Sequence, residues 1–169
     1  MGGRRKVLVI AVASLTAGLL LTGIAWAKAT KIPVAVTKEV WPSAQPPARQ
    51  WIDDDGIWHA RGNVANVVIQ GDLEGLGVAV VNLNLDLSTG NGDEAGYATM
   101  NLDWGDLSGT FEGHFSVTYT GFVGVGQGTY HGTGDFAGMK LIEQFTVTLS
   151  EEPPYHVTSE GTILNPHGE

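Results

Sequence analysis

The sequence predicts an all-β protein, an antiparallel up-and-down meander of strands that closes into a seven- or eight-stranded barrel. Three observations support this prediction. No segment after residue 27 shows a helical period. Long segments instead alternate apolar and polar residues with a period of two, which is typical of a sheet with one wet face. A pentapeptide, Gly-Asp-apolar-x-Gly, occurs three times, at intervals that fit two strands and one loop.

Residues 1–27 are expected to form a signal peptide or a membrane-anchor helix ahead of the barrel. Three basic residues, Arg4, Arg5 and Lys6, precede an uncharged apolar run. Ala25-Trp26-Ala27 then offers the small residues that a signal peptidase reads. The apolar run is also long enough for a single membrane span, so both alternatives stay open. Either one predicts an exported domain that is secreted, periplasmic or held at the cell surface.

Residues 28–50 are expected to be a Pro-rich tether, and residues 51–169 the barrel domain. Pro33, Pro42, Pro46 and Pro47 fall within this tether, and only its residues 32–36 are expected to form a short strand. From Trp51 onward glycine and β-branched residues become frequent.

Charge and cysteine content exclude several classes of partner. The chain has 18 acidic and 9 basic residues, a net charge of −9 at pH 7. This acidity argues against nucleic acid and against anionic membranes as partners. Contact with a membrane is therefore expected only through residues 1–27, if they are not removed. The chain has no cysteine, so packing alone must hold the domain together.

The expected strands follow from the turn signals. The pentapeptides begin at Gly71, Gly105 and Gly134, and should mark every second turn, all at one end of the barrel. Short connections between long strands favour antiparallel neighbours. A two-sheet sandwich is the competing architecture. We expect the strands at residues 57–70, 76–87, 94–104, 110–120, 123–133, 139–149 and 155–164.

A glycine-rich stretch, Gly121 to Lys140, is central to the prediction. Read with a period of two, one face of this strand consists of glycines bounded by the aromatic residues Phe122, Tyr130 and Phe136. Glycine weakens a strand, so a bare face of this kind indicates a tight barrel bend or the close approach of another group.

Glu143 is the clearest anomaly in the alternating pattern. It shares a face with Leu141, Phe145 and Val147, which are otherwise core candidates. A carboxylate inside a barrel must be paired or have a raised pKa, which would make it a candidate acid, base or ligand-orienting group. The alternatives are a bulge that reverses the register and a position at a wet rim.

A second polar group is suggested by the strand at residues 57–70. His59 and Arg61 are expected on one face of this strand, and Trp58 and Ala60 on the other. If the first pair points inward, it would join Glu143 near one mouth as a polar cluster in an apolar cavity. The Trp58 face is the competing candidate for the core.

No metal site is expected. Asp53-Asp54-Asp55-Gly56 and the acidic stretch from Asp86 to Glu94 have oxygen ligands that calcium could use, but neither matches a complete calcium loop. Solvated turns are the simpler interpretation. The histidines show no ligand spacing, and no Gly-x-Ser-x-Gly elbow is present.

The stretch Gly126-x-Gly128-Thr129-Tyr130-x-Gly132-Thr133-Gly134-Asp135-Phe136-Ala137-Gly138 resembles the strand-turn signature of bacterial proteins with an allene oxide cyclase-like or dirigent-like barrel. The resemblance covers roughly residues 109 to 149. It implies an eight-stranded barrel with an apolar lumen, often a homo-oligomer and free of cofactors. It carries no catalytic residue over to this chain.

These observations predict an exported barrel that binds a small hydrophobic or amphipathic ligand without catalysis. One alternative is a cofactor-free cyclase or isomerase that uses Glu143 as acid or base. Another is a structural surface module whose barrel is filled by its own side chains. The expected ligand-binding residues are Arg61, Phe115, Tyr119, Tyr130, Glu143 and Phe145.

Overall fold

The computed structural model describes residues 29–166, and they form a closed antiparallel β-barrel of eight strands with one additional strand. The expected signal or anchor segment, residues 1–27, lies outside the described residues. Within the described part of the chain, no helix is long and apolar enough to cross a membrane.

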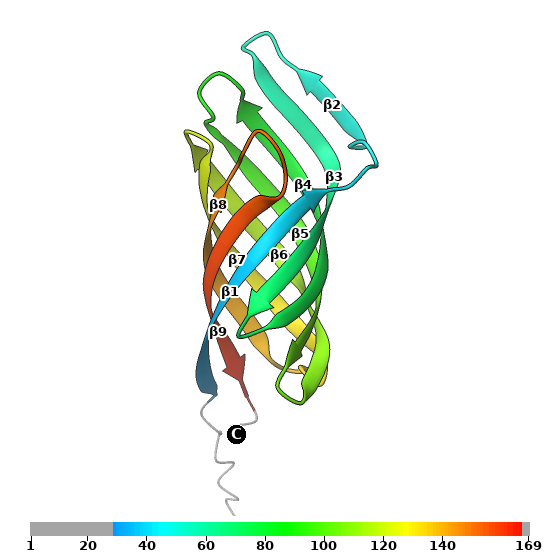
Figure 1. The fold of residues 1–169 in the computed structure, drawn as a ribbon, viewed down its shortest axis with the longest axis vertical. Helices are drawn as coiled ribbons and strands as arrows, with labels where there is room; N and C mark the ends of the chain where they lie inside the picture. The colour runs from blue at the N-terminus through cyan, green and yellow to red at the C-terminus, as the bar shows by residue number, and fades with distance from the viewer. Residues whose placement is uncertain (1–28, 167–169) are drawn as a thin grey trace, which may run out of the picture.

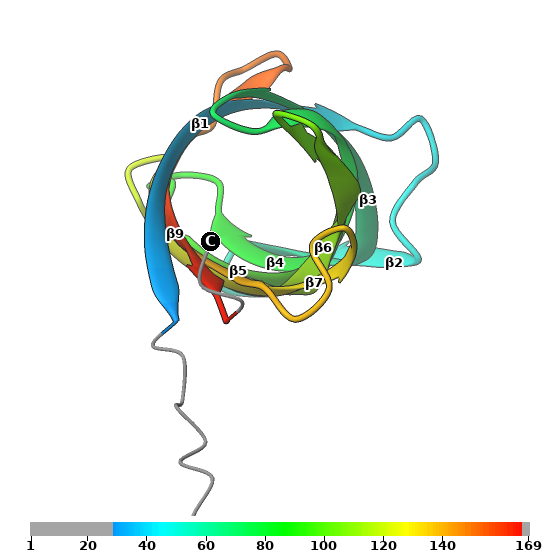
Figure 2. The same ribbon diagram turned by 90° about the horizontal axis from the view of Figure 1, so that it is seen from below.

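Nine strands follow one another as an up-and-down meander (Figure 1). Each strand pairs with its neighbours in the order β1-β9-β8-β7-β6-β5-β4-β3, and pairing of β1 with β3 closes the ring (Figure 2). This closure confirms the predicted barrel and excludes the sandwich. The strands are β1 (Thr30–Pro42), β2 (Arg49–Ile52), β3 (Ile57–Gly71), β4 (Glu74–Asp86), β5 (Gly92–Trp104), β6 (Leu107–Thr120), β7 (Val123–Gly134), β8 (Lys140–Thr148) and β9 (Tyr155–Asn165).

The three pentapeptides form the β3–β4, β5–β6 and β7–β8 turns, which lie together at one end of the barrel. We call this the packed end, because apolar side chains fill it. Leu73 and Phe136, the apolar residues of the first and third pentapeptides, are 1% and 0% exposed. Phe136 stacks on Phe111 with ring centroids 4.9 Å apart. The apolar third residue of the motif therefore folds beneath the strands and closes this end.

The expected tether is wrong for most of its length, because Thr30–Pro42 forms a full barrel strand. β1 pairs with β9 along Thr30 to Val40 and with β3 along Val36 to Pro42. Its alternating side chains Val34 and Val36 are buried in the core. Proline is tolerated here because Pro33 is exposed and Pro42 ends the strand. The barrel domain therefore begins near residue 30, not at residue 51.

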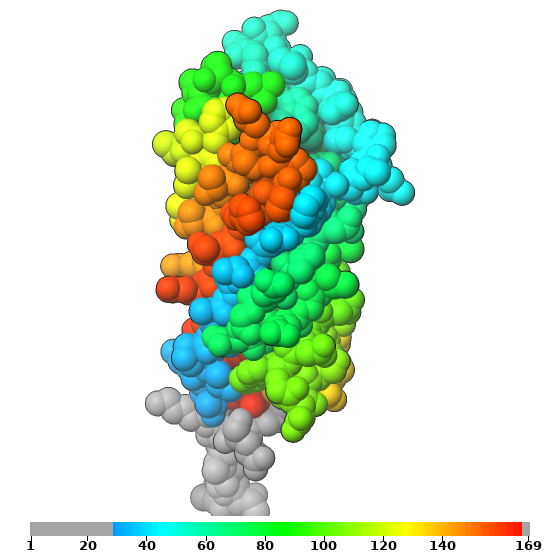
Figure 3. Space-filling view, in the orientation of Figure 1, coloured from blue at the N-terminus to red at the C-terminus, as the bar shows by residue number. Residues whose placement is uncertain are grey.

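The additional strand β2 pairs with the part of the β3 edge that β1 does not cover. β4 covers one edge of β3 throughout, while β1 pairs with Ala65 to Gly71 and β2 with Trp58 to Arg61 on the other edge. The hairpin of β2 and β3 extends beyond the other strands, and forms the far tip of the molecule in the space-filling view (Figure 3). We call this end, opposite the packed end, the mouth.

The bare face of β7 makes room for aromatic rings inside the barrel. Gly126 and Gly128 are buried and face the interior. A Cβ atom at Gly126 would meet the ring of Phe145, and one at Gly128 would lie 2.6 Å from ring atoms of Tyr130. The predicted close approach is confirmed, and the approaching groups are the protein's own aromatic side chains.

Candidate functional site

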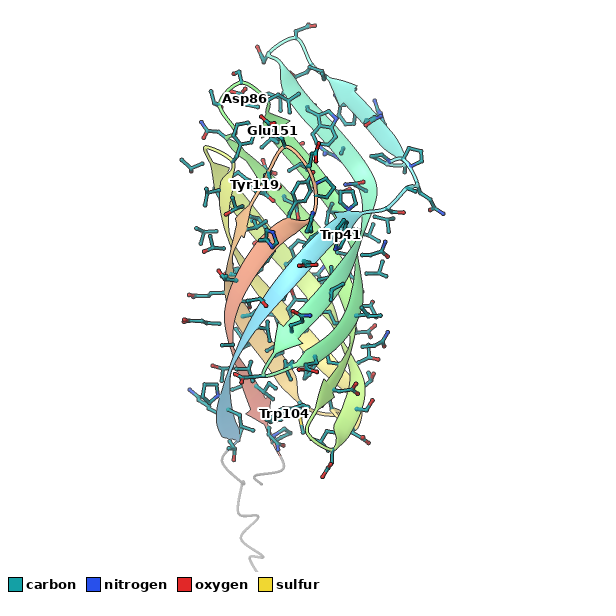
Figure 4. All side chains as sticks on the ribbon, viewed as in Figure 1. Trp41, Asp86, Trp104, Tyr119 and Glu151 are labelled. Carbon is teal, nitrogen blue, oxygen red and sulfur yellow. The ribbon has the colours of Figure 1, made fainter. Side chains whose placement is uncertain are left out.

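The half of the barrel nearer the mouth contains a cavity of about 560 Å³. Its walls are mainly aliphatic, with Val81, Leu83, Leu85, Val117 and Val147 among them. Residues of the β1–β2 connection and of the turns at the mouth line its outer part. In Figure 4, Tyr119, which lines the cavity, lies in the mouth half, while Trp104 lies near the packed end. The barrel is therefore packed at one end and hollow at the other.

A buried ion pair forms part of the cavity wall. Lys38 Nζ on β1 donates to both carboxylate oxygens of Glu143 on β8, at 2.7 Å each. Tyr130 Oη donates to Glu143 Oε1 at 2.8 Å, and Ser159 Oγ donates to Oε2 at 2.7 Å. The side chains of Lys38 and Glu143 are 9% and 2% exposed. Glu143 thus lies inside the barrel, and its carboxylate is fully hydrogen-bonded.

The partners of Glu143 determine its ionisation. Burial by itself would raise the pKa of Glu143, but the Lys38 ammonium and the hydrogen bonds from Ser159 and Tyr130 outweigh it, and the pKa lies below the ordinary value. Burial and the adjacent carboxylate both raise the pKa of Tyr130. The group is therefore a charged pair with a neutral phenol, and not a poised acid or base.

A second carboxyl group, Glu94 on β5, lines the cavity without a cationic partner. Tyr119 Oη donates to its Oε2 at 3.0 Å. Among residues 29–166 the only ion pairs are Lys38–Glu143 and His59–Asp53, so Glu94 has none. Burial raises the pKa of Glu94 to about 7, although the Tyr119 hydrogen bond opposes the shift.

The structure brings together five of the six expected ligand-binding residues. All five line the cavity, and they come from β6, β7 and β8. These residues are Phe115, Tyr119, Tyr130, Glu143 and Phe145.

Arg61 lies outside the cavity, so the expected cluster of His59 and Arg61 with Glu143 is wrong. A bulge between Ala60 and Asn63 reverses the parity of β3, so that Ala60 and Ala65 both face inward. Arg61 donates to the carbonyl oxygen of Leu83 and to Asn84, and its guanidinium lies 5.3 Å from the Trp51 ring. Arg61, Asn84 and Trp51 therefore lie together on the outer surface of the barrel wall.

His59 belongs to the same outer cluster. Its ring stacks on Trp51 with centroids 4.6 Å apart, and it contacts Asp53 and Asn84 through its two nitrogens. Hydrogen bonds with Asp53 and Asn84 raise the pKa of His59. The cluster fixes β2 against β3 and explains why this hairpin extends beyond the barrel as an ordered element.

Two charged residues of the cavity wall, Lys38 and Glu94, were not predicted from the sequence, although Lys38 could have been. Ile32, Val34, Val36 and Val40 alternate along β1, and Lys38 interrupts them as Glu143 interrupts β8. Two opposite charges that each break an apolar face would have predicted the pair. Glu94 had no such signal, because small and polar residues surround it in the sequence.

Asp86 and Asp53, the first residues of the two acidic stretches, accept hydrogen bonds within their own turns. Asp86 accepts hydrogen bonds from Ser88 and Thr89, which lower its pKa to about 2. Asp53 accepts from the backbone of Asp55 and Ile57. Among residues 29–166, no cluster of three or more His, Asp or Glu side chains could hold a metal ion.

Comparison with known proteins gives no match: no protein-family model and no curated protein sequence is similar to this chain. The resemblance to allene oxide cyclase-like and dirigent-like barrels therefore stays a prediction, and function must be argued from the cavity.

Proposed function

We propose that the barrel binds a small hydrophobic or amphipathic molecule in its mouth-side cavity. The observation that carries the proposal is the contrast between the two ends. The packed end shows that this sequence can fill a barrel completely, yet about 560 Å³ of the other half is left open behind aliphatic and aromatic walls. A cavity with these walls and a few placed polar groups is the usual form of a small-molecule site.

The Lys38–Glu143 pair supports binding in preference to catalysis. Its carboxylate is charged, fully hydrogen-bonded and held by an ammonium, which makes it a weak base. It serves better as a fixed polar patch at which a ligand's hydroxyl or carbonyl group would be oriented. The cyclase or isomerase alternative has no comparable observation in its favour. Export and oligomeric state remain predictions.

Fluorescence titration with N-phenyl-1-naphthylamine, an uncharged apolar probe, tests the proposal. Ala98 on β5 is buried and lines the cavity, whereas Ala95 on the same strand is exposed on the outer face. We expect saturable binding to the wild type and to Ala95→Phe, and at least tenfold weaker binding to Ala98→Phe, whose ring would occupy the cavity.

Circular dichroism of both variants provides the control for folding. If Ala98→Phe does not fold, Ala79→Leu, which also enlarges a buried side chain in the cavity wall, replaces it. Equal probe binding by the inner and outer variants would overturn the proposal, as would the absence of saturable binding to the wild type.

A further inference from the structure

We infer that the cavity selects a hydrophobic amine, a ligand with a cationic nitrogen and an apolar body, and that Glu94 is its counter-ion. The inference rests on the proposed function and names its ligand class. It depends on the charges that line the cavity, on the geometry of Glu94, and on the aromatic side chains of the wall.

The cavity has one unbalanced charge when Glu94 is ionised. Six titratable side chains line it, and three of these are tyrosines. The Lys38 ammonium and the Glu143 carboxylate neutralise each other through two 2.7 Å hydrogen bonds. Glu94 is the remaining group. The full titratable set is Lys38, Glu94, Tyr119, Tyr130, Glu143 and Tyr155.

Glu94, which lines this space, has one carboxylate oxygen without a hydrogen-bond partner within residues 29–166. Its Oε2 accepts from Tyr119, and its Oε1 has no hydrogen-bond partner within residues 29–166. No side-chain oxygen or nitrogen in that range is both fully buried and unpartnered, so Oε1 must be accessible. Because Glu94 lines the cavity, a ligand cation can reach this oxygen from inside.

The neighbours of Glu94 offer no competing cation. Across β4 it is opposite Leu83, and across β6 it is opposite Val117, both buried and apolar. Within residues 29–166, Tyr119 is the only titratable group that forms a hydrogen bond with it. An ammonium ion placed here would gain the attraction of a poorly solvated carboxylate, whereas an anionic ligand would be repelled.

Aromatic rings supply the second element of amine recognition. A cation over an aromatic face is attracted by the ring quadrupole, and rings around one carboxylate suit an ammonium group. The protein already places one cation in this way, since Lys38 Nζ lies 5.6 Å from the Phe145 ring centroid. Seven aromatic residues line the cavity: Trp58, Phe115, Tyr119, Phe122, Tyr130, Phe145 and Tyr155.

Amine binding should depend on pH in a defined direction. A cation binds the ionised form of Glu94, and the pKa of this group is about 7. Affinity for a permanently charged ammonium should therefore rise as the pH increases from 5 to 8. A neutral ligand should show no such rise.

Three ligands with the same octyl chain test the inference by isothermal titration at pH 8 and pH 5 on the full chain, below their micelle concentrations. They are octyltrimethylammonium, octanol and octyl sulfate. At pH 8 we expect the cation to bind at least tenfold more tightly than octanol, and the sulfate to bind most weakly. At pH 5 the advantage of the cation should shrink to about threefold or less.

Glu94→Gln should abolish the preference for the cation, so that octyltrimethylammonium binds no more tightly than octanol. Glu112→Gln removes the same charge from the exposed face of β6 and should keep the preference. Octanol binding at least as tight as that of the cation, or a preference that survives Glu94→Gln, would overturn the inference but leave the proposed function intact. Binding of none of the three ligands would overturn both.

Discussion

At the scale of single residues, the Lys38–Glu143 pair dominates the barrel interior. Desolvating two charges costs several kcal/mol each, and the attraction between them offsets this only when the remaining hydrogen bonds are made. Here Tyr130 and Ser159 complete the carboxylate. Such a pair adds little net stability compared with apolar residues of the same size, but removal of one partner leaves an uncompensated buried charge.

We therefore expect Lys38→Met and Glu143→Gln each to lower the free energy of unfolding by about 3–5 kcal/mol. The double variant should be more stable than the sum of these losses predicts, because neither charge remains. Urea unfolding of the four proteins in a double-mutant cycle measures this coupling. Additive losses would show that the two groups do not interact in solution.

Glu94 should have the opposite dependence on pH from Glu143. Its pKa in the folded protein is about 7, above the ordinary value of 4.5, so the stability it contributes is complete below about pH 4.5 and is lost as the pH rises toward 7. Glu94→Gln stays neutral throughout. The variant should therefore gain about 1–3 kcal/mol over the wild type at pH 8 and nothing at pH 4, by urea unfolding.

The residue scale also shows why the predicted site was incomplete. Glu143 was recognisable because one charge broke an apolar alternation. Arg61 was misplaced because the bulge at Ala60 to Asn63, with Gly62 at φ 64°, reverses the facing of β3, and a single glycine among many did not indicate it. The alternation of a strand predicts which side chains point into the barrel only as far as the next bulge.

At the scale of elements, β7 shows how a strand of low intrinsic propensity becomes a necessary part of the wall. The missing side chains of Gly124, Gly126 and Gly128 leave space for rings from β7 and from its neighbouring strands. Larger side chains on this face of β7 would displace the aromatic residues that border the cavity.

Gly126→Ala should destabilise the protein by about 1–3 kcal/mol. The new methyl group would meet the Phe145 ring and would lie 2.8 Å from the carbonyl oxygen of Ser116, so backbone as well as side chain must move. Gln127→Ala, on the exposed face of the same strand, should change stability by less than about 0.5 kcal/mol. Similar effects from both substitutions in thermal or urea unfolding would contradict this role of the glycine face.

β1 should be indispensable to folding. A chain that begins at Thr30 keeps every barrel strand, whereas one that begins at Trp51 loses β1 and leaves β3 and β9 with open edges. We expect the first to be a folded species with cooperative unfolding and the second to aggregate. Gel filtration and near-ultraviolet circular dichroism distinguish these results, and a folded chain starting at Trp51 would restore the tether interpretation.

Seven of the strands could be predicted from the sequence, because pentapeptide turns and alternating residues mark their ends and, apart from the bulged part of β3, their faces. Of β1 only residues 32–36 were expected, because four prolines between residues 33 and 47 suggested a tether. Pro33 is exposed, Pro42 ends the strand, and Pro46 and Pro47 lie in the connection before β2. β2 is too short, at four residues, to show a period. Its position depends on the tertiary contacts of Trp51 with His59 and Arg61.

At the scale of the whole molecule, the closed barrel has its densest packing at one end of its axis and its cavity toward the other. Leu73, Phe111, Phe136 and Ile163 are almost completely buried at the packed end, where they stabilise the fold. The mouth half leaves space and places its polar groups around it. Substitutions in the cavity wall should thus alter the proposed ligand binding while the packed end maintains the fold.

The positions of β1 and β9 have a practical consequence. Thr30 pairs with Asn165, so the first and last strands meet at the packed end. A fusion partner, an affinity tag or a sensor surface that is linked to the chain before β1 or after β9 would hold the molecule by this end. The opening would point away from the attachment, so an immobilised barrel could be exposed to candidate molecules without a steric block.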